Sequence, residues 1–172
     1  LIPGTISLGY LEKVLCLLLR EGVPIRDMET ILETLGDHAG ALKDIDIVTE
    51  YVRQALKRTI TRRFAEANSL RVITVDPKVE DTIVASVKKS EAGSYLAMDP
   101  DLIQKIVNIT SGEIDKVKDV IPNIIILTSP IVRIYFKKLI DQFIPNITVL
   151  SYSEIDNTAQ IPVSYTHLRA HE

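Results

Sequence analysis

Up to about residue 66, apolar side chains recur every three or four residues, a spacing that predicts amphipathic helices. Ser7 can cap the first of these helices, because its hydroxyl can accept a hydrogen bond from a free backbone N–H. Gly22 suits the left-handed position that follows a helix, and Pro24 prevents its continuation. Asp27 can then cap a second helix. The run Leu18–Leu35, LLREGVPIRDMETILETL, therefore predicts a helix, a tight turn and a second helix.

A third helix is expected to follow Asp44 or Asp46. The three helices together predict a helical subdomain over residues 1–66. One side of this third helix carries Val48, Tyr51, Val52, Ala55 and Thr59.

Beyond residue 66 the pattern changes to short β-rich runs, most of which end in Asp or Ser followed by proline. Asp or Ser at the N-cap, with Pro at the first helical position, is a strong helix start. Strands that alternate with helices predict a sheet flanked by helices. We therefore predict an α/β subdomain over residues 67–160, with a mostly parallel or mixed four-stranded sheet, and an α+β or α/β fold for the chain. The expected strands are Leu70–Val75, Tyr95–Met98, Ile124–Thr128 and Ile147–Tyr152.

Residues 161–172 fit neither pattern. The stretch VSYTHLRAHE has no sustained period and resembles translated sequencing-adaptor sequence, so we expect a non-native tail here. His167 and His171 have the i,i+4 spacing of a helical metal site, but they lack a third ligand, and we predict no metal. The chain begins at Leu1 without an initiator Met, and we expect it to be a fragment of a longer protein.

Charge and composition exclude several classes of protein. The net charge of −3 argues against a surface that seeks nucleic acid. No segment approaches the ~18 uncharged apolar residues of a membrane helix. The lone Cys16 cannot form an internal disulfide, and in a leucine-rich helix it is expected to pack as a small hydrophobe.

The strand ends offer one arrangement that could support catalysis. If the strands are parallel, Asp76, Asp99 and Thr128 with Ser129 would lie near their carboxyl ends, where α/β enzymes bind ligands. The alternative is that Asp76, Asp99 and Ser129 cap the helices that follow, each contributing about 1 kcal/mol. The proline directly after each of them favours the capping interpretation.

Other candidate chemistry is weak. The 7 glycines form no phosphate-binding loop, and the common nucleophile and zinc motifs are absent. Asp37 with His38, and Glu29 with Glu33, are interpreted as solvated pairs at helix surfaces. We predict no catalytic, cofactor-binding or metal-binding residues, and no cofactor.

The third helix becomes basic toward its C-terminus. Its cations are interpreted either as partners of the helix dipole or as a docking surface for a neighbouring subunit or an acidic partner. No aromatic residues interleave with them as stacking platforms for nucleic acid. The candidate contact residues are Arg53, Lys57, Arg58 and Arg62, with Arg63 beside them.

Five ordered blocks resemble one family. They are LLREGVPIRDMETILETL, TEYVRQAL at Thr49–Leu56, GSYLAMDP at Gly93–Pro100, ILTSPIVR at Ile126–Arg133 and VLSYSEI at Val149–Ile155. The chain from Leu1 to about Ile155 resembles the C-terminal cytoplasmic region of the flagellum/injectisome type III export-gate family. TEYVRQAL and ILETL favour the flagellar branch, with the injectisome branch as the alternative.

The resemblance implies a protein with an N-terminal multi-helix membrane portion and a cytoplasmic portion of four subdomains. This chain would hold the third, helical subdomain and the fourth, α/β subdomain. Such proteins form a ring of nine subunits at the cytoplasmic face of the bacterial inner membrane. They receive export substrates with their chaperones and contact other parts of the export apparatus. The family is not known as an enzyme, and its main chaperone pocket lies in subdomains outside this chain.

Overall fold

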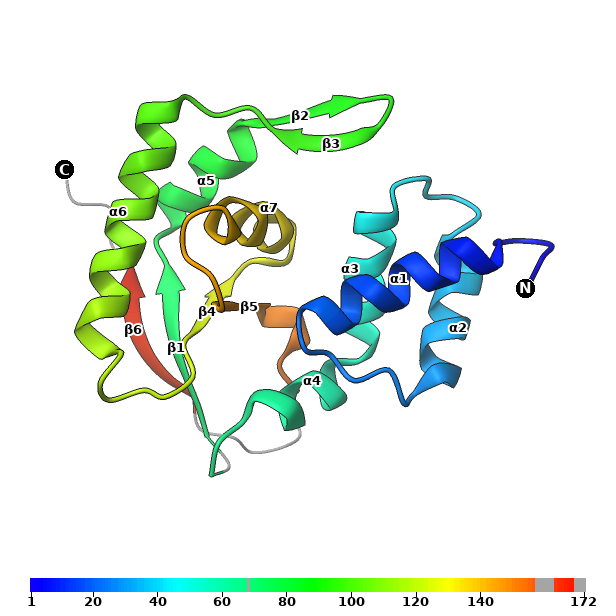
Figure 1. Cartoon of the computed structure of the whole chain (residues 1–172), viewed down its shortest axis with the longest axis horizontal. Helices are drawn as coiled ribbons and strands as arrows, with labels where there is room; N and C mark the ends of the chain where they lie inside the picture. Colours follow the sequence, from blue (N-terminus) through cyan, green and yellow to red (C-terminus); the bar gives the residue numbers. More distant parts are fainter. Residues whose placement is uncertain (68, 157–162, 169–172) are drawn as a thin grey trace. The chain divides into compact units, whose positions relative to one another are not determined.

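The computed structural model describes residues 1–67, 69–156 and 163–168 (Figure 1). The chain divides into two units, a helical unit and an α/β unit. Of the described residues, 1–65 and 153–156 belong to the helical unit, and 66–67, 69–152 and 163–168 belong to the α/β unit. The chain therefore leaves the helical unit after Ala65 and returns to it after Tyr152. The sequence pattern instead predicts that the α/β subdomain includes all of residues 67–160.

The helical unit begins with the predicted pair of helices, α1 (Leu8–Arg20) and α2 (Met28–His38). The Ser7 hydroxyl accepts a hydrogen bond from the Tyr10 N–H at 3.0 Å, and the Asp27 carboxylate accepts one from the Thr30 N–H at 3.2 Å. Gly22 has a φ of 73°, a conformation that residues with a Cβ rarely adopt. The capping residues and the turn glycine therefore have the roles that the sequence predicts.

The predicted third helix is two helices. Helix α3 (Ile45–Ala55) ends at Leu56, and α4 (Lys57–Phe64) begins directly after it. Leu56 has φ −88° and ψ 18°, outside the helical range, and its side chain is buried. The prediction of one continuous helix was wrong because no Gly or Pro marks this break in the sequence.

A buried ion pair ties the residues after Tyr152 to the helices of the helical unit. Arg53 on α3 donates from Nε to Glu154 Oε1 at 2.8 Å and from Nη2 to Glu154 Oε2 at 2.9 Å. The two side chains are 1% and 0% exposed. Two parallel hydrogen bonds between a guanidinium and a carboxylate form a strong, geometrically specific contact.

Further polar contacts surround this ion pair. Arg53 Nη1 lies 3.7 Å from Glu21 Oε2, just beyond the end of α1. The buried Thr61 hydroxyl donates to the Glu154 carbonyl at 3.1 Å and accepts from the Asp156 N–H at 2.9 Å. Residues 153–156 are therefore held by side chains of both α3 and α4.

The α/β unit contains a parallel sheet with the strand order β5–β4–β1–β6. Its strands are β1 (Leu70–Val75), β4 (Ile125–Thr128), β5 (Thr148–Ser151) and β6 (Val163–Leu168). Parallel neighbours need long crossover connections, and α7 (Pro130–Asp141) supplies the one between β4 and β5. The predicted mixed fold with a mostly parallel sheet is confirmed.

The strand expected at Tyr95–Met98 is not part of this sheet. The strand β3 (Gly93–Leu96) pairs in antiparallel fashion with β2 (Val87–Ser90) in a separate two-stranded hairpin. Helices α5 (Pro77–Ala85) and α6 (Pro100–Val117) flank this hairpin along the chain. The sequence prediction missed β2 because its VKKS run has the polar composition of a loop.

The fourth strand of the sheet is β6, which pairs with β1. It lies inside residues 161–172, the segment expected to be a non-native tail. The remainder of that segment, 161–162 and 169–172, lies outside the described residues.

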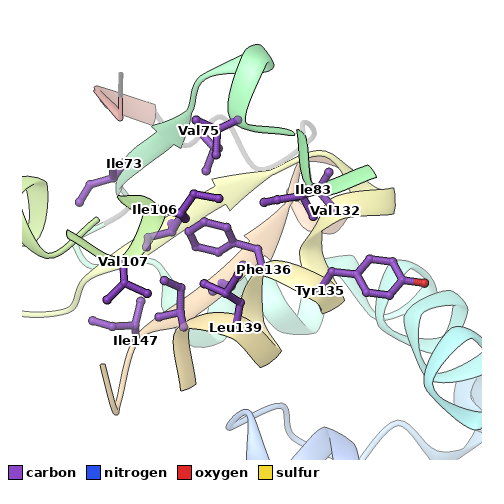
Figure 2. Close-up of a cluster of buried hydrophobic side chains, with 14 of the residues drawn as sticks. Ile73, Val75, Ile83, Ile106, Val107, Val132, Tyr135, Phe136, Leu139 and Ile147 are labelled. Carbon is purple, nitrogen blue, oxygen red and sulfur yellow. The ribbon is translucent and has the colours of Figure 1, made fainter. Parts of the chain in front are cut away.

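The core of the α/β unit lies between one face of the sheet and three helices. Figure 2 shows the Phe136 ring of α7 among aliphatic side chains, including Ile106 of α6 and Ile83 of α5. The register places Ile73, Ile126 and Val149 side by side on β1, β4 and β5. The opposite face of the sheet is apolar as well, as is usual for parallel strands. Its buried residues include Leu70, Val72, Ile125, Leu127 and Leu150.

Two of the three predicted Asp/Ser-Pro helix starts have a side-chain cap. Asp76 accepts from the Lys78 N–H at 2.8 Å, and Asp99 accepts from the Asp101 N–H at 2.9 Å. Ser129 occupies the same position before α7, but its hydroxyl makes no capping hydrogen bond. The capping interpretation is therefore confirmed for the two aspartates and is wrong for Ser129.

This difference predicts unequal effects of alanine substitution. Asp99→Ala should lower the free energy of unfolding by about 1 kcal/mol, because the substitution leaves a helix N-terminal N–H without its acceptor. Ser129→Ala, the matched control, should change it by less than about 0.5 kcal/mol. Urea denaturation followed by circular dichroism measures both values. Equal losses from the two variants would contradict the assignment of the caps.

The buried ion pair predicts a larger effect. Arg53→Met should cost about 3–5 kcal/mol, because it leaves the Glu154 carboxylate buried without its main partner. The double variant Arg53→Met/Glu154→Leu should cost less than the sum of the two single variants. Arg58→Met is the control, since Arg58 is 71% exposed in its ion pair with Asp156 and should contribute only ~0–1 kcal/mol. Similar losses for Arg53→Met and Arg58→Met would show that the buried pair stabilises the fold no more than the exposed pair does.

Candidate functional site

The structure only partly assembles the proposed catalytic rim. Asp76 and Ser129 follow β1 and β4, which are neighbours in the parallel sheet, so both lie at its carboxyl edge. Asp99 follows β3 of the separate hairpin and is therefore not at the end of a sheet strand. The two acids of the rim also serve as helix caps, which occupies an oxygen of each.

The N-terminus of α7 at this edge is already occupied by a carboxylate. The Ser129 N–H donates to Glu80 Oε1 at 3.0 Å. The buried Thr128 hydroxyl donates to the Ser129 carbonyl at 2.9 Å. A helix N-terminus attracts anions through its free N–H groups and its dipole, and α/β enzymes use it to bind phosphate. Here Glu80 supplies the anion from within the chain.

Among the described residues, the other titratable side chains do not gather into a reactive cluster. Burial raises the pKa of the Tyr10 phenol, and the charge of Asp44 adds to this effect. The Tyr10 hydroxyl has no hydrogen-bond partner within the described residues. His38 stacks on Tyr51 with 4.3 Å between the ring centres. Across residues 1–67, 69–156 and 163–168, no three metal-binding side chains come together.

Arg53 is not a surface residue, in contrast to the other candidate contact residues. Its side chain is 1% exposed and its charge is balanced by Glu154. Arg53 therefore cannot present its guanidinium to another subunit. The sequence pattern of α3 could not reveal this, because Glu154 lies 101 positions further along the chain.

The remaining candidates form an exposed positive surface on α4. We call Lys57, Arg58, Arg62 and Arg63 the α4 basic surface, since all four side chains are exposed and lie on one short helix. Arg58 Nε lies 3.5 Å from Asp156 Oδ2. Lys57 and Arg62 have no ion-pair partner in the part of the chain that the structure describes.

Helix α4 has a short buried side and a long positively charged side. The helix buries Ile60 and Thr61 and directs its four cations outward. The guanidinium of Arg63 lies 5.3 Å from the centre of the neighbouring Phe64 ring, within the range of a cation–π contact. Three arginines on two helical turns can bind carboxylates in pairs of hydrogen bonds, so this surface suits an acidic protein partner.

The exposed cations of α4 were predictable from the sequence, whereas the partners of the buried and half-buried acids were not. Glu80 and Glu154 have roles set by residues 49 and 101 positions away, respectively. A periodic pattern reports which face of a helix is apolar, and it does not report partners at such separations.

Comparison with known proteins assigns the chain to a family. The profile described as "FHIPEP family" matches residues 1–160. The flagellar biosynthesis protein FlhA of Bacillus subtilis is 39% identical over 160 residues, which is 92% of this chain and 24% of that protein. The invasion protein InvA of Salmonella typhimurium is 31% identical over 156 residues, or 91% of this chain and 23% of InvA. The chain thus spans about a quarter of the length of these relatives.

Solved structures agree with the sequence comparison. The nonameric SctV-C of EPEC has a TM-score of 0.78 and 30% identity, covering 95% of this chain and 48% of that one. The Chlamydia pneumoniae CdsV and CdsO complex has a TM-score of 0.79 and 33% identity, with the same coverage. With a family profile over residues 1–160 and relatives at 31–39% identity, this chain belongs to the FHIPEP family.

Proposed function

We propose that this chain is part of the cytosolic domain of a flagellar type III export gate. In this role it contributes to ring assembly and to the docking of export chaperone–substrate complexes and other export-apparatus proteins. The observation that carries the proposal is the 39% identity to Bacillus subtilis FlhA over 160 residues. The protein then acts at the cytoplasmic face of the bacterial inner membrane. None of the helices within the described residues has the length and apolarity of a membrane span.

Self-association is the first part of this function. Its support is the nonameric assembly of the related SctV-C, to which this chain is similar over 95% of its length. The α4 basic surface is the proposed subunit or partner contact, with Lys57, Arg58 and Arg62 as its main residues. These cations are exposed, whereas the charge of Arg53 is neutralised inside the helical unit.

The role is a binding role and not a catalytic one. Its support is that Asp76 and Asp99 cap helices and that Glu80 accepts from the Ser129 N–H, so these three carboxylates serve the fold. Docking of a second apparatus protein is supported by the related CdsV, which has been solved in a complex with CdsO.

An injectisome export gate is the second candidate function. The observation that favours it is the 31% identity to the invasion protein InvA over 91% of this chain. The two candidates share one physical role and differ in the proteins that they export.

A pair of chimeras distinguishes the two candidates. Residues 1–160 replace the corresponding quarter of Bacillus subtilis FlhA in one and of Salmonella typhimurium InvA in the other. We expect the FlhA chimera to restore swimming motility to a strain that lacks FlhA. We expect the InvA chimera to restore invasion weakly or not at all to a strain that lacks InvA. Restoration in the InvA background alone would refute the flagellar assignment.

The same FlhA chimera tests the α4 basic surface. Lys57→Glu/Arg58→Glu/Arg62→Glu should raise the concentration for half-assembly of its cytosolic part at least about tenfold, which corresponds to ~1.4 kcal/mol. Sedimentation velocity and electron microscopy of the purified cytosolic part measure assembly. The control Lys43→Glu/Lys88→Glu/Lys89→Glu changes the net charge equally at exposed sites elsewhere and should leave assembly unaltered. Intact rings in the first variant would remove α4 from the interface.

A further inference from the structure

A narrow groove lies between α5 and α6 in the α/β unit. We call it the α5–α6 groove, and its volume is about 110 Å³. This approaches the ~150 Å³ of an apolar cavity that holds one benzene molecule, so the groove has room for one large apolar side chain. Its lining is largely aliphatic, with Val79 and Ile106 buried and Leu102 and Ile109 half-buried.

A second hollow continues the groove along α6. It has a volume of about 390 Å³ and shares Lys105 and Ile109 with the α5–α6 groove. Its lining residues Asp101, Gln104, Lys105, Asn108 and Ile109 follow the i, i+3, i+4, i+7, i+8 spacing of one helix face. This face extends over about 12 Å of α6, which matches roughly two turns of a second helix laid beside it.

Two lysines give the α5–α6 groove a positive charge. Lys78 and Lys105 both line it, both are exposed, and neither has an ion-pair partner among the described residues. The described lining of the groove includes no acidic residue, although the chain as a whole has a net charge of −3. An apolar slot beside two unpaired cations is complementary to an apolar side chain flanked by carboxylates.

We propose that the α5–α6 groove binds a short amphipathic helix of a partner protein. One apolar side chain of that helix enters the groove, and carboxylates one turn to either side pair with Lys78 and Lys105. Grooves of this kind recognise helices through apolar residues at i, i+3, i+4 and i+7. The inference builds on the docking role proposed above and assigns it a location and a partner chemistry.

The test uses the whole chain and two synthetic helical peptides. Both peptides carry leucines at i, i+3, i+4 and i+7; one has glutamates on the flanks of this stripe and the other has lysines at the same positions. Titration to about 1 mM, followed by amide chemical shifts, measures binding and locates it. The acidic peptide should shift the amides of residues 78–82 and 101–109 saturably and bind at least about tenfold more tightly than the basic peptide.

A charge swap makes the test specific. Lys78→Glu/Lys105→Glu should reverse the preference, so that the basic peptide binds more tightly than the acidic one. Lys88→Glu/Lys89→Glu makes the same change in net charge on the β2–β3 hairpin and should preserve the original preference. Unchanged circular dichroism and melting temperature establish that both variants are folded.

Three results would overturn the proposal. Equal binding of the two peptides would show that the lysines do not select carboxylates. Shifts confined to other parts of the chain would place the binding site elsewhere. Self-association of the chain that Lys78→Glu/Lys105→Glu abolishes would make a second copy the occupant. None of these results affects the FlhA chimera, whose restoration of motility tests the proposed function separately.

Discussion

The buried ion pair between Arg53 and Glu154 joins two parts of the helical unit that lie far apart in the sequence. A charge removed from water is costly unless an opposite charge with good geometry meets it, and here both side chains are at most 1% exposed. Glu154 comes three residues after the end of β5 (Ser151). The chain therefore has to return to α3 directly after this strand. Together with the hydrogen bonds of Thr61 to Glu154 and Asp156, this pair holds residues 153–156 in the helical unit.

Acidic side chains also have partners inside the protein in the α/β unit. Glu80 satisfies the N-terminus of α7, and Asp76 and Asp99 satisfy those of α5 and α6. Groups that would attract an anionic substrate therefore serve the fold. The exposed cations of α4 and of the α5–α6 groove are among the charges that remain at the surface, where they can meet other proteins. This distribution is consistent with a protein that assembles and docks.

Local chemistry was predictable from the sequence, and long-range pairing was not. The roles of Ser7, Asp27 and Gly22 followed from capping and turn preferences, and the structure confirms them. The break at Leu56 and the polar strand β2 carry no local signal, because no Gly or Pro marks the break and VKKS reads as a loop. Arg53 was predicted as a contact residue, and its burial was missed because its partner Glu154 lies far along the chain. The α4 basic surface was predictable because its cations are close together in the sequence.

The separation of Arg53 and Glu154 also has a consequence for synthesis on the ribosome. The two residues are 101 positions apart, and a bacterial ribosome adds roughly 5–20 residues per second. Helix α3 therefore emerges about 5–20 s before its counter-charge exists. During that interval the nascent helices carry an arginine that cannot be buried with its native partner. The helical unit, although it is made first, reaches its final packing only after the strands β1, β4 and β5 have been translated.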